Sequence, residues 1–479
     1  MSGNEWFTSR LSFCGLVGTA LNSSHFSANN LKSLKEGFFG LCKDETPMVR
    51  RAAATALPRV LDALSSQEII DEIIPAFAKL SQDPQESVSI LWVANIGDIT
   101  AQLSPDLNIE HTLSHIQKLA KDRSWRVRLT ICNSLDKMVS GMGPTSSSKC
   151  LLPIFLELLH DLEGEVRASA ASHLETFFMT LDLSEVMSTL FPVLEELLDG
   201  DSQRSVKLTV VKGFMGEKLL KTLGAEKVVS KLLPLLHKVL KDSQGASETR
   251  LLILEKCNAL IVCAGRQAVR DQWADEFLNL YEKSKDHNGG SENSGVGVNG
   301  DEVEHPQWRL RVAILRAMEN LYGNEEMQQF ATIWAAALSD DICEVRMIAA
   351  RLLGSMCVPG HSVGMDVVSS LFIPKLVAFF QASVDKFSRR TVFVEAVKSL
   401  MQHQEAFDKF FVGGPLMEPF CRCLEDKVSN VRLAAINAIA SSKNSSIRQV
   451  FAKQINEMVN DSDMDVQNVA QECVSDSLL

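Results

Sequence analysis

A short motif returns along the chain at a nearly fixed interval, and this repeat constrains the fold more than any other feature. Four segments align directly, namely KDETPMVR (43–50), QDPQESVS (82–89), KDRSWRVR (121–128) and HDLEGEVR (160–167). Their valines recur at a constant step of 39 residues, at Val49, Val88, Val127 and Val166. The series continues less strictly at Val206, Thr249, Leu310, Val345, Ser388, Val431 and Val466. A period of this length is typical of solenoids built from stacked helix pairs.

Two charged positions accompany the repeated valine. An aspartate stands five residues before it, as in Asp44, Asp83, Asp122, Asp161, Asp201, Asp340, Asp426 and Asp461. A basic residue often follows it, as in Arg50, Arg128, Arg167, Lys207, Arg311, Arg346 and Arg432. These pairs could be read as catalytic or phosphate-binding. Because the pattern is periodic, we favour a structural role, in which the aspartate caps the second helix and the arginine pairs with a neighbouring repeat's aspartate.

Each repeat reads as two helices joined at this aspartate turn. Apolar runs precede the turn, and four of them carry a proline that should bend the first helix, at Pro75, Pro153, Pro192 and Pro234. After the turn, Thr46 is a candidate N-cap and Pro47 suits the first helical position. Val49, Ala53, Leu57, Val60 and Leu64 then mark one buried face. We predict an all-α fold, an α-α superhelix or solenoid of about eleven HEAT repeats.

Composition agrees with this fold and narrows the partners. The chain has 479 residues, too many for one compact core, with 46% apolar but only 6% aromatic residues. Its net charge of −12 disfavours nucleic acid and anionic membranes. Eleven scattered cysteines without a CxxC pair suggest free thiols in a reducing compartment. With neither a signal peptide nor a membrane-length apolar run, we expect a cytoplasmic protein, and a nuclear location stays open.

The sequence offers little for catalysis or metal binding. It contains no P-loop, hydrolase elbow, metalloprotease or kinase motif. His111 and His115 stand at i and i+4 in an expected helix but lack an obvious third ligand. Cys421 and Cys423 should point to different helix faces. We therefore expect no enzyme activity, no cofactor and no metal, although a helical-repeat hydrolase stays as a minor alternative.

The turns are better candidates for a functional surface. In a stacked solenoid they should align along one ridge, open to another protein. Two turns place a tryptophan beside an arginine, at Trp125-Arg126 and Trp308-Arg309, and both residue types are enriched at binding hot spots. Pro47 and Met48 form a similar apolar knob beside Arg51. Residues 285–304, rich in Gly, Asn and Ser, are expected to form a flexible insertion.

At these motifs the chain resembles the scaffold (A, 65 kDa) regulatory subunits of serine/threonine protein phosphatase 2A. The resemblance rests on EWFTSRLSFCGL (5–16), DETPMVRRAAA (44–54), KDRSWRVR (121–128), GEVRASAASH (164–173) and WRLRVAI (308–314). It extends over essentially the whole chain, and it is strongest before residue 180. Members of that family usually carry more repeats, so we expect the first repeats of the family to be missing here.

The resemblance implies a non-catalytic scaffold that joins a phosphatase catalytic subunit to a regulatory B subunit. Residues 1–284 would form the regulatory-subunit-binding half, and residues 305–479 the catalytic-subunit-binding half. Carried over by position, the regulatory contacts are Pro47, Met48, Arg51, Trp125 and Arg126. The catalytic-subunit contacts are Trp308, Arg309, Asp341, Arg389, Val428 and Asp465. An importin-like HEAT adaptor that binds cargo or a small GTPase is the alternative.

Overall fold

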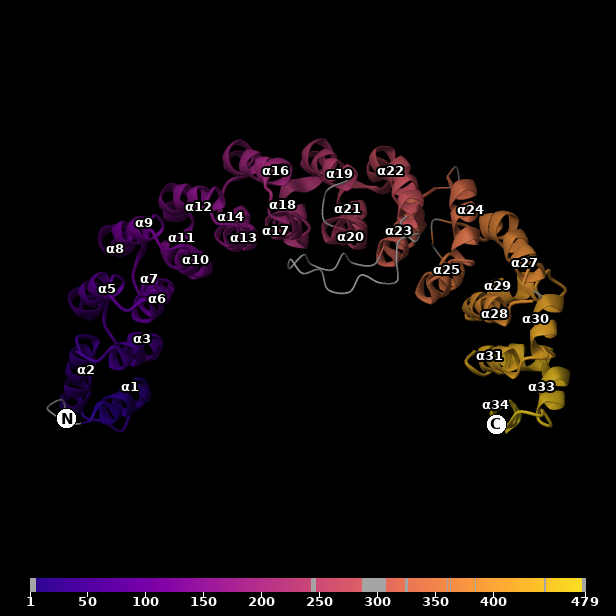
Figure 1. The fold of residues 1–479 in the computed structure, drawn as a ribbon, viewed down its shortest axis with the longest axis horizontal. Coiled ribbons are helices and arrows are strands. Elements are labelled where there is room, and N and C mark those ends of the chain that lie inside the picture. The colour runs from indigo at the N-terminus through magenta and orange to yellow at the C-terminus, as the bar shows by residue number, and fades with distance from the viewer. Residues whose placement is uncertain are drawn as a thin grey trace. The chain divides into compact units, whose positions relative to one another are not determined.

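A computed structural model describes residues 6–242, 247–286, 307–323, 326–359, 361, 363–383, 385–442 and 445–475. Over these residues the chain is an all-α solenoid, with helices and turns but no strands. It divides into two compact units, residues 1–225 and 226–479. Within each unit the helices form two layers, which we call first and second helices after their order in each repeat (Figure 1).

In unit 1 the second helices form a continuous stack, because α1 packs on α3, α3 on α6, α6 on α10, α10 on α13 and α13 on α17. This layer comprises α1 (Phe7–Leu21), α3 (Pro47–Leu61), α6 (Glu86–Ala94), α7 (Ile96–Ala101), α10 (Trp125–Asn133), α11 (Leu135–Ser146), α13 (Gly164–Ser172), α14 (Leu174–Thr180) and α17 (Arg204–Phe214). The first-helix layer comprises α2 (Ala28–Cys42), α4 (Ser66–Glu68), η1 (Ile69–Ile73), α5 (Ile74–Leu80), α8 (Pro105–His111), α9 (Leu113–Leu119), η2 (Ser147–Leu151), α12 (Leu152–Leu159), α15 (Leu183–Glu185), η3 (Val186–Leu190) and α16 (Phe191–Gly200). The last helix, α18 (Glu217–Lys227), contains the boundary between the units.

Unit 2 repeats the arrangement, with α20 packed on α23, α23 on α25, α25 on α28, α28 on α31 and α31 on α34. Its second helices are α20 (Ser247–Glu255), α21 (Cys257–Ala264), α23 (Trp308–Leu321), α25 (Cys343–Ser355), α28 (Phe387–Met401), α31 (Ser429–Ala440) and α34 (Met464–Ser475). Its first helices are η4 (Val228–Leu232), α19 (Leu233–Lys241), α22 (Arg266–Asp286), α24 (Met327–Ala337), α26 (Met365–Val367), η6 (Val368–Phe372), α27 (Ile373–Gln381), α29 (Gln404–Phe410), α30 (Met417–Leu424), α32 (Ser445–Val450) and α33 (Ala452–Met458).

The predicted proline bends are π-helical turns. Pro75, Pro153, Pro192 and Pro234 each lie in the first turn of an α-helix that follows a five-residue π-helix, and Pro374 in α27 adds a fifth case. A proline has no N–H to donate to the carbonyl four residues back. The preceding turn therefore widens to i→i+5 bonding, which is a local π-bulge.

The core is aliphatic, with aromatic residues between repeats. Phe155 of α12 stacks on Phe177 of α14 with ring centroids 3.9 Å apart. Three fully buried tryptophans, Trp92, Trp273 and Trp334, each donate the indole N–H to a backbone carbonyl. That bond satisfies the only polar atom of the side chain. In the part of the chain that the structure describes, no helix has the length and apolar character needed to cross a membrane.

The helix α22 corrects the start of the expected insertion. It continues through Asp286, so Lys285 is helical, and its ammonium lies 4.7 Å from the centre of the Tyr281 ring. The cation–π contact and the helical hydrogen bonds outweigh the low apolar content of this stretch. The rest of the insertion lies outside the described residues. The assignment of residues 1–284 and 305–479 to two binding halves stays a prediction.

Candidate functional site: the turn ridge

The turns between first and second helices form a common edge in each unit, which we call the turn ridge. In eight of these turns the aspartate carboxylate accepts the backbone N–H of the residue two positions later, at distances of 2.8 or 2.9 Å. That N–H lies just before the second helix, so the aspartate closes the turn rather than capping the helix, which corrects the prediction. Thr46 occupies the N-cap position but its side chain makes no capping hydrogen bond.

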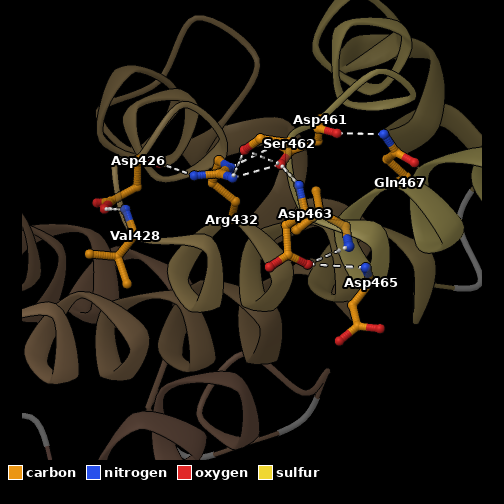
Figure 2. Close-up of polar contacts among 9 residues, drawn as sticks. Asp426, Val428, Arg432, Asp461, Ser462, Asp463, Asp465 and Gln467 are labelled. Atoms are coloured by element: carbon orange, nitrogen blue, oxygen red, sulfur yellow. Dashed lines mark hydrogen bonds and ion pairs between the residues drawn. The ribbon is translucent and has the colours of Figure 1, made fainter.

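Arginines of the second helices join successive turns into a ladder (Figure 2). Nη1 of Arg432 donates to the Asp426 carbonyl of its own turn at 2.8 Å. Its Nε and Nη2 donate to the two carboxylate oxygens of Asp461 in the next turn, at 2.7 and 2.6 Å. The same fork joins Arg50 to Asp83, Arg128 to Asp161, Arg167 to Asp201 and Arg390 to Asp426. Arg311 forms an ion pair with Asp340 and donates to it from Nη2 alone, at 3.1 Å. The structural interpretation of the Asp–Arg pattern is confirmed for these pairs.

The sequence pattern missed two rungs, those of Arg10 and Arg390. Arg10 pairs with Asp44 at 2.7 Å although no aligned motif precedes it. For the rung of Arg390, the sequence repeat placed Ser388 at the position of the recurring valine. Ser388 is exposed, whereas the valines of the repeat are buried. The reason is a longer turn, because Arg390 reaches back seven residues to the Ser383 carbonyl, whereas Arg50, Arg128, Arg167 and Arg432 reach back six.

The ladder changes the ionisation of its members. The hydrogen bond from Arg432 is the main cause that lowers the pKa of Asp461. At Asp161, burial opposes ionisation, but hydrogen bonds from Arg128 and from the Glu163 amide outweigh it, and the pKa is lowered. Asp161 and Asp461 stay charged at neutral pH, so their two rungs are charge-assisted, bidentate contacts.

In unit 1 the predicted regulatory-subunit contacts lie along the turn ridge. Pro47 begins α3 and is half-buried, Met48 is 54% exposed, and Arg51 is exposed. Trp125 begins α10 and is half-buried beneath the exposed Arg126, whose guanidinium carbon lies 4.7 Å from the centre of the ring. The structure therefore places both groups on one edge, as the sequence predicted for the turns.

The turn before α6 lies between these two groups and was not predicted to take part. Glu86 contacts Arg126 at 3.8 Å and the Ser124 hydroxyl at 3.4 Å. The rung from Arg50 to Asp83 ties the same turn to α3. No local motif marks Glu86, since its position matters only once the repeats are stacked.

In unit 2 the Trp–Arg arrangement recurs at the start of α23. Trp308 is half-buried, and the guanidinium carbon of the exposed Arg309 lies 5.6 Å from the centre of its ring. The rung from Arg311 to Asp340 joins this turn to the next one, where Asp341 is exposed. A cationic group over an indole ring is stabilising.

The remaining predicted contacts of unit 2 occupy three further turns. Arg389 is half-buried at the start of α28, Val428 is half-buried just before α31, and Asp465 is exposed in the first turn of α34. Figure 2 shows Val428 and Asp465 beside the ion pair of Arg432 and Asp461, and neither side chain takes part in that pair. The six predicted residues thus share one edge of unit 2.

Trp308 and Arg309 also line an open groove of about 840 Å³, which the sequence did not reveal. The groove runs over α20, α23 and α25, so its walls come from three separate repeats. Glu319 is buried at one side, where it accepts a hydrogen bond from Ser355, and burial raises the pKa of its carboxyl. No single helix carries a signal for such a groove.

The histidine pair does not form the expected helical arrangement. The helix α8 ends at His111, Thr112 interrupts the helix, and α9 begins at Leu113. His115 packs edge-on against Phe77 with ring centroids 6.1 Å apart. Within the described ranges, no group of three His, Cys, Asp or Glu side chains is placed to hold a metal ion.

Family comparisons agree with the repeat architecture. Residues 144–224 match a PPP2R1A-like HEAT repeat and residues 416–442 match a HEAT repeat. Importin beta is similar over 98% of this chain and 59% of its own, with a TM-score of 0.58 at 12% identity. Kap95p is similar over 98% of this chain and 63% of its own, with a TM-score of 0.56 at 13% identity. The chain is an all-α HEAT-repeat protein.

Sequence relatives point to one group within this class. The A-type regulatory subunit of protein phosphatase PP2A from Schizosaccharomyces pombe is 38% identical over 146 residues, which is 30% of this chain and 25% of the relative. The beta isoform of the human A-type 65 kDa regulatory subunit of phosphatase 2A is 27% identical over 265 residues, 54% of this chain and 43% of the relative. The aligned segments span less than half of either relative. The resemblance to the phosphatase 2A scaffold subunits is confirmed over these segments.

Proposed function

We propose that this chain is a non-catalytic scaffold that holds a regulatory B subunit together with a phosphatase 2A catalytic subunit. The observation that carries the proposal is the paired Trp–Arg stack, which occurs once on the turn ridge of each unit, at Trp125 and Trp308. Both rings are half-buried, while three other tryptophans are in the core. The similarity to scaffold subunits supplies the kind of partner.

The mechanism follows from tethering. Unit 1 would hold the regulatory subunit through Pro47, Met48, Arg51, Trp125 and Arg126. Unit 2 would hold the catalytic subunit through Trp308, Arg309, Asp341, Arg389, Val428 and Asp465. Two partners bound to one chain would meet at a higher effective concentration than two partners free in solution. Substrate choice would then depend on the regulatory subunit, and we expect the assembly in the cytoplasm.

The experiment is affinity purification of the tagged chain from its own cells, followed by mass spectrometry. We expect phosphatase catalytic and regulatory chains with the wild type. The Trp308→Ala variant should lose the catalytic chain, and Trp125→Ala should lose the regulatory chain, each without loss of the other. Fluorescence of a tagged copy tests the cytoplasmic location.

The alternative is a transport adaptor, favoured by the similarity of the fold to importin beta and Kap95p over nearly the whole chain. That similarity, at 12% and 13% identity, reflects the fold alone. Recovery of transport factors without phosphatase chains in the same purification would support the adaptor and refute the scaffold.

A further inference from the structure

The ladder lacks an acidic residue at two steps of unit 2, after Arg250 and after Arg346. Arg346 of α25 is held as the other ladder arginines are, because its Nη1 donates to the carbonyls of Asp340 at 2.6 Å and Asp341 at 2.8 Å. In the filled rungs, the Nε and Nη2 edge of the arginine then meets an aspartate of the next turn. For Arg346 that turn is the one before α28.

The equivalent residue in that turn is Ser383. Its carbonyl accepts Nη1 of Arg390 at 3.2 Å, as the Asp426 carbonyl accepts Nη1 of Arg432. The Ser383 side chain is buried, and its hydroxyl donates to the Phe379 carbonyl at 2.5 Å. A short neutral side chain turned into its own helix offers no carboxylate to Arg346.

The binding edge of Arg346 is therefore open. Among the described residues, no acceptor contacts its Nε or Nη2, and Asp385, two positions after Ser383, makes no ion pair with it. Neither atom is among the buried polar atoms that lack a partner, so both remain accessible. We call this edge the open step.

A second step without an acid differs in this respect. Ser284 takes the turn position that follows Arg250, and its carbonyl accepts Nη1 of Arg311 at 2.8 Å. Nε of Arg250 is buried without a hydrogen-bond partner. Nε of Arg250 is closed to solvent, whereas Nε and Nη2 of the half-buried Arg346 both reach it.

We propose that the open step is a binding site for a carboxylate of a partner protein, either an Asp or Glu side chain or a C-terminus. A guanidinium fork matches two oxygens of a planar carboxylate. Because two carbonyls already hold Nη1 of Arg346, less conformational entropy is lost on binding than for a mobile arginine. The filled rung of Arg432 shows the geometry that the complex would copy (Figure 2).

Two basic residues lie on the side of the open step that faces α28. Lys386 is in the turn before α28 and Arg389 is at the start of that helix. The acids of this region are Asp385 in the same turn, and Asp341 and Glu344 beside Arg346. Asp341 and Arg389 also belong to the predicted partner-binding edge. A carboxylate ligand at this edge does not require the partner to be a phosphatase.

The test uses the full chain and a hexaglutamate peptide as the probe. The ¹⁵N signal of the Arg346 Nε–H group, assigned through Arg346→Lys, is followed during titration. We expect it to shift with hexaglutamate and not with sodium chloride of equal ionic strength. The net charge of −12 disfavours non-specific binding of this probe. The absence of a shift would refute the proposal, as would a response to inorganic phosphate but not to the peptide.

Two variants sharpen the result. Arg346→Gln should bind the peptide about tenfold more weakly, since a charge-assisted fork is lost. Lys453→Gln, at an exposed lysine of α33, controls for the loss of one positive charge and should bind as the wild type does. Ser383→Asp should fill the step and remove the response, with Ser383→Asn as its neutral control. If Ser383→Asp does not fold, the test rests on Arg346→Gln. An affinity of Arg346→Gln for hexaglutamate equal to that of the wild type would overturn the site. Stronger binding after Asp385→Asn would show that Asp385 already occupies the edge, which also overturns it.

Discussion

At the scale of single residues, the structure separates tryptophans by what their indole N–H groups do. Trp92, Trp273 and Trp334 are fully buried and donate to backbone carbonyls, so they belong to the core. Trp125 and Trp308 are half-buried at helix starts, each beside a stacked arginine. This difference supports a binding role for the second pair and gives a direct test of it.

Replacing Trp308 with alanine should weaken catalytic-subunit binding by about 2 kcal/mol or more, since a central aromatic anchor is lost. Thermal unfolding should change little. Binding is measured by titration calorimetry and unfolding by circular dichroism. Trp273→Ala in the same unit is the opposite control, because removing a core ring should lower the unfolding temperature strongly. A Trp308 variant that unfolds many degrees earlier yet still binds would place the ring in the core.

Replacing Asp161 with asparagine should cost roughly 2–3 kcal/mol at neutral pH, because Arg128 loses its charged partner in a part-buried site. The pKa of Asp161 is lowered in the folded state, so its stabilising contribution is present above the unfolded value of about 3.9 and is lost as pH falls through the folded value. Urea unfolding of both proteins at several pH values measures the difference, which should shrink below about pH 4.

The exposed Glu163 on the same turn provides the control. Glu163→Gln removes one negative charge and leaves the ladder intact, so its stability should stay within about 0.5 kcal/mol of the wild type. An equal loss in both variants would show that net charge, rather than the rung, stabilises this turn.

At the scale of elements, the sequence predicted the helix pairs and their aspartate turns but not their finer geometry. The prolines predicted a bend in the first helix, and the structure shows a π-helical turn before each of them. Pro374, which the sequence analysis did not single out, follows the same kind of turn. Periodicity placed Arg346 correctly in the ladder series but could not show that Ser383 leaves it without a carboxylate. Turn length is set by contacts between repeats, so no local pattern encodes it.

Replacing Pro192 with alanine should destabilise the protein modestly, by about 0.4–1 kcal/mol. The native backbone already suits proline, and alanine increases the entropy of the unfolded chain. Chemical denaturation measures the change. Leu194→Ala in the same helix is a contrasting variant, since deleting a fully buried side chain should cost about 2–5 kcal/mol. A stabilised Pro192→Ala protein would mean that the π-turn is strained.

At the scale of the whole molecule, the chain divides into two compact units that carry similar ladders. The fold class followed from the sequence, because a strict repeat of helix pairs can bury its apolar faces only by stacking. The common edge of the candidate residues followed from the same logic. The groove beside Trp308 did not, because its walls converge from α20, α23 and α25.

In a repeat array, stability depends on nearest neighbours, so a core defect should act within its own unit. Phe177→Ala removes a ring stacked in unit 1 and should cost about 3–5 kcal/mol there. Hydrogen exchange should quicken in helices of unit 1, such as α12 and α14, and stay unchanged in α31 and α34 of unit 2. Uniformly faster exchange along the chain would show that the two units unfold as one.

The rungs also make the array directional. Every filled rung takes its arginine from one repeat and its aspartate from the following one, so a repeat such as that of Asp161 and Arg167 carries an acceptor toward one neighbour and a donor toward the other. Deleting one whole repeat between two such turns would leave an arginine facing an aspartate at the new junction. Deleting half a repeat would instead leave an arginine or an aspartate without its partner. Gene duplication or loss can thus alter the length of such an array in whole-repeat increments while the junctions between filled rungs remain chemically matched.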